Sequence, residues 1–159
     1  MVYPHLTYDY DVARKAELVL RNHHSYLTDC LKSVLDSLMF NNSHTLHPRR
    51  LREIGVEQSQ RFLSFLVNAD VAAVTVYGKQ LAQDGLGYKS MVQMCGCLSP
   101  FCCEKLSSES IELQSSAIKA ANMYITAAMD GFLEEYTVQL KKDQLYIREA
   151  FNKVAASGQ

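Results

Sequence analysis

The last third of this chain contains no proline and only one glycine, Gly131, between residues 109 and 155. Because proline and glycine are the residues that most often interrupt a helix, this stretch predicts one continuous helix that follows Ser107 and Ser108. A helix of roughly 45 residues is much longer than those of small globular domains, so its full length cannot be buried. We therefore expect the end of this helix to project from the rest of the protein.

The rest of the sequence also favours helices. It has seven Gly, three Pro and no Trp in 159 residues, whereas many short strands would require more turn residues. With 48% hydrophobic residues, the chain can bury the core of one domain and leaves no room for a second. We predict an all-α fold in which residues 1–159 form a single domain, with an irregular arm at 1–10 and a long final helix at 109–155.

Apolar residues at steps of three and four predict further helices before the final one. Asp9 or Asp11 is the expected cap of the first helix and Asp70 of the third, because a carboxylate accepts hydrogen bonds from free amides. Pro48 suits the first turn of the second helix, where its missing N–H needs no partner. The expected ranges are 11–40, either one helix or two that meet near His23 and His24, then 48–67, 70–84, and 88–106 with a kink at Pro100.

Charge and hydropathy argue against several classes of partner. The 16 basic residues are balanced by 17 acidic residues along the chain, so we expect no polybasic face for nucleic acid or an anionic membrane. No apolar run approaches the roughly 18 residues of a membrane span, and the first residues lack the pattern of a secretion signal. Five cysteines, an odd number, form a poor disulfide framework. We therefore expect a cytoplasmic protein.

Four of the cysteines raise the question of a metal or redox site. On one helix, Cys95 and Cys102 would share an apolar face while Cys97 and Cys103 point elsewhere, so we expect packing and no metal. An exposed Cys97 or Cys103 would remain the candidate for redox chemistry or a covalent ligand. The histidines all lie at or before His47 and lack a metal-binding spacing.

Three arginines, Arg49, Arg50 and Arg52, fall in the first turn of the second expected helix. Guanidinium groups beside free helix amides favour a carboxylate or phosphate. The alternative is a solvated face in which Arg50 pairs with Glu53. We expect no catalysis, because the sequence has neither a nucleophile motif nor a phosphate-binding loop.

From about Ile54 onward, the order of segments resembles the N-terminal sensory domain of RsbR-type stressosome proteins, which are non-haem members of the globin superfamily. The resemblance rests on EQSQRFLSFL at 57–66, YGKQLAQDGL at 77–86 and DQLYIREAF at 143–151. It implies that residues 48–67, 70–84, 88–106 and 109–150 are similar to globin helices E, F, G and H. A ligand cavity would then lie between the helices that are similar to E, F and G.

The resemblance also implies what this cavity would bind. Other globin relatives bind fatty acids or linear tetrapyrroles (bilins), which are apolar molecules with carboxylates. A histidine-ligated haem is not expected, since no histidine follows His47. The residues expected to line the cavity are Phe62, Phe65, Val74, Tyr77, Leu81, Met91, Cys95 and Leu98, with Arg49, Arg50 and Arg52 at its rim.

The final helix carries a candidate dimer interface. Tyr136, Leu140, Ile147, Ala150 and Val154 follow alternating steps of four and three, with Asp143 in the gap, which is typical of a coiled-coil seam. Proteins of the similar family are dimers that signal through this helix to a downstream protein or domain. We therefore predict a non-catalytic, homodimeric sensor; the alternatives are a bilin-binding globin with a cysteine thioether, or a purely structural dimerisation module.

Overall fold

The computed structural model describes residues 8–42 and 46–158. These ranges contain helices and no strand, so the prediction of an all-α fold is confirmed. The expected arm at 1–10 lies mostly outside the described residues, apart from Tyr8, Asp9 and the start of the first helix. The helices are α1 (Tyr10–Arg21), α2 (His24–Ser37), the 3₁₀ helix η1 (Met39–Asn41), α3 (Pro48–Asn68), α4 (Val71–Gln83), α5 (Tyr88–Cys95), α6 (Leu98–Lys105) and α7 (Ile111–Ser157).

Local capping chemistry fixes the ends of the early helices. Asp9 Oδ1 accepts hydrogen bonds from the N–H groups of Asp11 and Val12, both at 3.1 Å, which starts α1. The segment 11–40 divides into α1 and α2 at His23, as one of the two predicted alternatives requires. Asp70 caps α4 through the N–H of Ala73 at 3.0 Å, as predicted.

The segment 88–106 differs from its prediction, since it forms two helices that meet at Gly96 and Cys97. Pro100 is the third residue of α6 and lies in its first turn. A proline there removes an N–H that has no partner inside the helix. The chain therefore bends before the proline, and α6 is not kinked at it.

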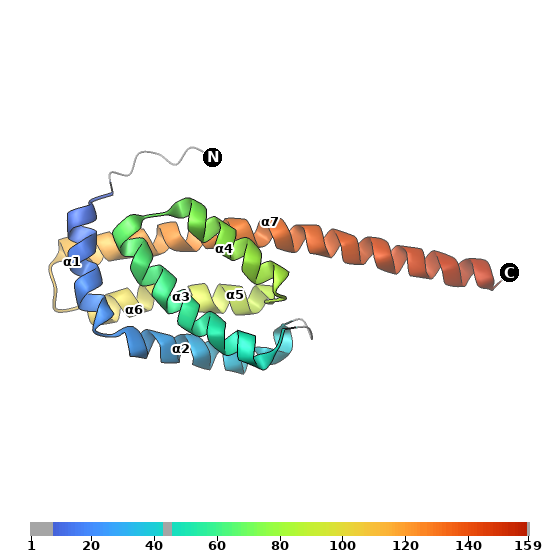
Figure 1. Ribbon diagram of the computed structural model, residues 1–159, viewed down its shortest axis with the longest axis horizontal. Helices are drawn as coiled ribbons and strands as arrows, with labels where there is room; N and C mark the ends of the chain where they lie inside the picture. Colours follow the sequence, from blue (N-terminus) through green and yellow to red (C-terminus); the bar gives the residue numbers. More distant parts are fainter. Residues whose placement is uncertain (1–7, 43–45, 159) are drawn as a thin grey trace.

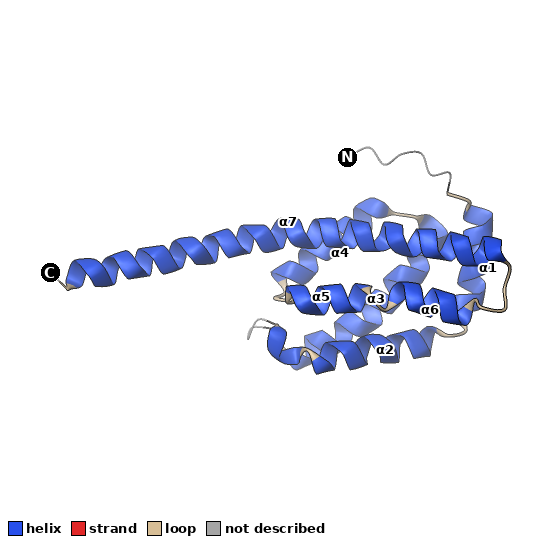
Figure 2. Cartoon of the chain, turned by 180° about the vertical axis from the view of Figure 1, so that it is seen from behind, coloured by secondary structure: helices blue, strands red, loops and turns tan. Residues whose placement is uncertain are grey.

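Helix α7 runs along the whole length of the molecule (Figure 1). Helix α4 packs along its middle, α1 crosses its first part, and α6 and α5 lie beside it, as the reverse view in Figure 2 also shows. Helix α3 packs mainly against α2 and α1. The buried faces of all seven α-helices meet in one hydrophobic core within the described part of the chain.

The last third of α7 extends beyond every other helix, which confirms the predicted projection (Figures 1 and 2). From Leu140 to Gly158 every residue is exposed. We call residues 140–158 the tail. Across the described residues, no helix has the length and apolar character that a bilayer crossing requires.

Candidate functional site

The eight apolar residues predicted to line a cavity are brought together in the core. All eight are buried, and they come from α3, α4, α5 and α6. The space between α3 and α7 is filled by Tyr124 of α7, whose ring centroid lies 5.6 Å from that of Phe62 and 5.5 Å from that of Phe65, both edge to face. Edge-to-face aromatic contacts of this kind stabilise a core beyond simple burial.

A polar pair lies inside this apolar core. The hydroxyl of Tyr124 donates to Gln58 Oε1 at 2.7 Å, and both side chains are fully buried. Gln58 Nε2 and the hydroxyl of Ser90 have no hydrogen-bond partner among the described residues. Burial of a polar group without a partner costs stability, so these atoms could bind an additional polar group.

The sequence analysis missed Gln58 and Tyr124. Gln58 lies four residues after Ile54 and four before Phe62, so a polar residue on an apolar helix face was the available signal. Burial raises the pKa of Tyr124 well above its ordinary value. Burial, and then the charge of Glu57, raise the pKa of Tyr77. Both phenols are therefore neutral hydrogen-bonding groups at physiological pH.

A surface groove of about 370 Å³ between α3 and α4 lies next to this core. Phe65 and Val74 belong both to the groove and to the predicted cavity. The guanidinium carbon of Arg61 lies 4.2 Å from the ring centroid of Tyr77, so a cation covers the aromatic ring. The groove is lined by Glu57, Gln60, Arg61, Ser64, Phe65, Asn68, Asp70, Ala73 and Val74.

The three arginines expected at the rim do not line this groove. Arg50 Nη1 lies 2.6 Å from Glu57 Oε1 and Nη2 lies 2.9 Å from Asp84 Oδ2, so Arg50 joins α3 to the end of α4. Arg49 is exposed and pairs with Glu53 at 3.2 Å, and Arg52 is exposed. Arg61 is therefore the arginine that the structure brings to the groove, and the other three are placed elsewhere.

Helices α4 and α7 approach each other closely at two glycines. A Cβ added to Gly78 would overlap the backbone oxygen of Ala128, and one added to Gly131 would overlap the backbone oxygen of Thr75. Lys79 Nζ lies 3.0 Å from Glu134 Oε1 in the next turn. Because backbone packs on backbone here, α4 and α7 should move as one unit.

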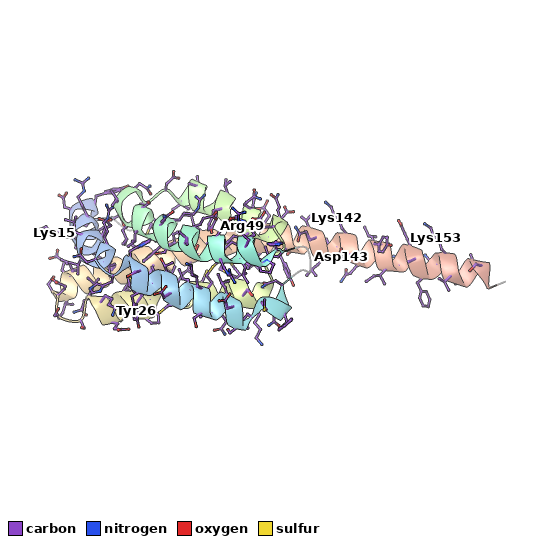
Figure 3. The ribbon with its side chains drawn as sticks, turned by 60° about the horizontal axis from the view of Figure 1, so that its bottom comes forward. Lys15, Tyr26, Arg49, Lys142, Asp143 and Lys153 are labelled. Atoms are coloured by element: carbon purple, nitrogen blue, oxygen red, sulfur yellow. The ribbon has the colours of Figure 1, made fainter. Side chains whose placement is uncertain are left out.

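The tail of α7 exposes the residues predicted to form a dimer seam. Leu140 is 45% exposed, Ile147 66% and Val154 70%, and Ala150 is also exposed. Tyr136 lies at the base of the tail, where its ring stacks on Phe132 with centroids 5.4 Å apart. The side-chain view shows the tail extending away from the other helices, with Lys142, Asp143 and Lys153 labelled along it (Figure 3).

Four of the cysteines lie in or next to α5 and α6 and differ in burial. Cys95 and Cys102 are buried, and burial raises the pKa of each thiol to about 12. Cys97 is half-buried with a pKa raised mainly by burial, and Cys103 is exposed. His44 lies outside the described residues. Within them, no three His, Cys, Asp or Glu side chains are placed to share a metal ion.

No protein-family model, curated protein or solved structure matches this chain. The resemblance to RsbR-type sensory domains therefore stays a prediction, and so does the globin-like arrangement that it implies.

Proposed function

We propose that this protein is a non-catalytic regulatory domain of globin-like type, which senses a small ligand and signals through its long C-terminal helix. The observation that carries this proposal is the close packing of α4 on α7 at Gly78 and Gly131. One side of α4 borders the groove with α3, and the other side is held against the helix that forms the tail. A change at the groove therefore has a direct structural path to the tail.

The proposed ligand is a small apolar molecule with a carboxylate, such as a fatty acid, which would bind in the groove with its carboxylate at Arg61. The buried side chains of Phe65 and Val74 form its apolar floor, and Arg61 supplies a cation beside the carboxylates of Glu57 and Asp70. Gln58 Nε2, which lies in the core and does not line the groove, is a buried donor without an acceptor among the described residues. A ligand acts as a signal only if it binds two helix arrangements with different affinities.

The proposed output is a homodimer formed through α7. Large apolar side chains that are exposed along a projecting helix are costly in water unless a partner covers them. In the proposed protein, a second copy covers Leu140, Ile147 and Val154, and a downstream protein or domain reads the state of the paired helices. No histidine lies in α4, so the proposed ligand is not a histidine-ligated haem.

Sedimentation velocity of the full chain tests the proposed homodimer. The native chain should sediment as a dimer, and Ile147→Asp should sediment as a monomer, because it places a carboxylate in the apolar interface. Leu145→Asp is the matched control, since Leu145 is 58% exposed but lies on the other side of the same helix. A native monomer, or equal dimerisation of both variants and the native chain, would overturn the proposed interface.

A further inference from the structure

The exposed apolar side chains of α7 belong to a repeat that is longer than the tail. Starting at Ile118, residues at steps of four, three and four lie on one helix face. The face contains Ile118, Asn122 and Ile125, then Met129, Leu133 and Tyr136, then Leu140, Gln144 and Ile147, and finally Phe151. Corresponding residues are therefore 11 apart, as at positions 118, 129, 140 and 151.

This face is accessible along its whole length. In the globular part, Ile118, Ile125, Met129 and Tyr136 are half-buried, while Asn122 and Leu133 are exposed. In the tail, exposure rises to 66% at Ile147 and 75% at Phe151. The face is thus one continuous partly apolar surface that begins on the domain and ends on the tail.

We propose that this face is the interface with a second copy of the chain, and that the two α7 helices pair in parallel and in register from Ile118 to Phe151. This inference rests on the proposed function and specifies its partner geometry. The proposed interface shares Tyr136, Leu140 and Ile147 with the seam predicted for the tail and extends back along α7 to Ile118. A period of 11 residues corresponds to about 3.67 residues per turn, which favours a nearly straight or slightly right-handed pair over a left-handed coiled coil.

Two polar positions on the face support this register. Asn122 and Gln144 are separated by two full repeats, and every other member of the face is apolar. In a parallel, in-register pair, each amide meets the same amide of the partner subunit and can hydrogen-bond with it. A shift in register would place these amides against apolar side chains of the partner subunit. The two amides therefore disfavour pairings in a shifted register.

Charge at the edges of the face agrees with this arrangement. Asp143 and Arg148 lie on opposite edges of the stripe and are five residues apart in the sequence. In parallel helix pairs, side chains on opposing edges meet across the interface at that offset. Asp143 would then pair with Arg148 of the partner subunit, and with the symmetric pair the dimer would gain two ion pairs.

An antiparallel pair of tails fits the observations less well. It would cover Leu140, Ile147 and Phe151 but leave the globular half of the face, from Ile118 to Leu133, in water. The parallel pair covers both halves. Burial of the larger apolar area favours the parallel pair.

Disulfide trapping in the full chain tests the inference. Gln144→Cys and Asn122→Cys each place a thiol at a position that faces itself in the proposed dimer, within the Cα separation that a disulfide spans. Each variant is exposed to oxidised glutathione and its mass is measured under denaturing, non-reducing conditions. Glu149→Cys, on the opposite side of the tail, and the native chain with its exposed Cys103 are the controls.

We expect most of the Gln144→Cys and Asn122→Cys chains to shift to the mass of two chains, while both controls stay at the mass of one. If the protein sediments as a dimer but Gln144→Cys is not trapped beyond the controls, the parallel register is wrong and the proposed function stands. If Gln144→Cys is trapped but Asn122→Cys is not, the part of the face on the globular domain does not belong to the interface, and the proposal is wrong on that point. If the protein sediments as a monomer, the homodimer in the proposed function is wrong as well.

Discussion

Gly78 of α4 lies against the backbone of α7 at Ala128 with no room for a side chain between them. The relationship is reciprocal, since Gly131 of α7 lies equally close to the backbone of α4 at Thr75. Two backbones in contact cannot yield as flexible side chains do. The pair of glycines therefore explains how the short helix beside the groove and the long helix that projects from the domain can act as one body.

This contact predicts the effect of adding one methyl group. Gly78→Ala should lower the free energy of unfolding by about 3 kcal/mol, because the new Cβ would overlap backbone atoms. Chemical denaturation monitored by circular dichroism measures the change. Gly55→Ala is the control, since its Cβ would come closest to the side-chain Cγ of Lys32 at 3.0 Å and would meet the Lys32 backbone only at ordinary contact distances of 3.5 and 3.7 Å. That variant should be neutral or more stable by up to about 1 kcal/mol. Equal destabilisation of the two variants would contradict the account of the α4–α7 contact.

The buried hydrogen bond between Tyr124 and Gln58 gives a second prediction. Tyr124→Phe should cost about 1–3 kcal/mol, because it leaves Gln58 buried without any partner. Adding Gln58→Met should restore part of that loss, since no unpaired polar atom then remains. A double-mutant cycle of unfolding free energies measures the coupling. Additive costs would show that the two side chains do not interact.

The raised thiol pKa values predict the response to alkaline pH. Burial raises the pKa of Cys95 and Cys102 from 9.0 to about 12, so the folded protein keeps these protons when the unfolded chain has lost them. The contribution of these two thiols to the free energy of unfolding is therefore fully present below pH 9 and is lost as the pH rises towards 12. Each group contributes a slope of about 1.4 kcal/mol per pH unit in that window. Thermal unfolding of Cys95→Ala should show a shallower decline above pH 9 than the native chain. An unchanged decline would exclude Cys95 as a contributor.

The same burial predicts which cysteines can be modified. In the folded protein, iodoacetamide should label the exposed Cys103 well before Cys95 or Cys102, because the buried thiols are both inaccessible and protonated. Peptide mass mapping after a short labelling time measures the order. Labelling in denaturant is the control and should reach all five cysteines. Rapid labelling of Cys102 in the folded state would contradict its placement in the core.

The sequence predicted the features of the fold that depend on neighbouring residues. Asp9 and Asp70 cap helices because their carboxylates reach amides two or three residues ahead. Pro48 begins α3 because its ring suits the first turn. The length of α7 follows from the lack of helix-breaking residues, and its projection follows from that length.

The features that the sequence did not predict depend on residues that are far apart in the chain. Gln58 and Tyr124 are separated by 66 positions, so nothing near Gln58 indicates its partner. Arg61 reaches the groove because α3 turns it towards Tyr77 of α4, whereas Arg50 is held by Asp84. All four arginines have the same chemistry, and only their place on the α3 surface separates them. Each predicted cavity residue is buried because its place on an apolar helix face is a local pattern, which the sequence shows.

The proposed function requires that the protein is a dimer that holds a small ligand, and native mass spectrometry tests both requirements most directly. Protein purified from its own host should be observed as two chains with additional mass that is lost on denaturation, as a non-covalent ligand requires. The size of that mass would distinguish a fatty acid from a linear tetrapyrrole. A single chain of 17.9 kDa with no additional mass would contradict both the dimer and the bound ligand.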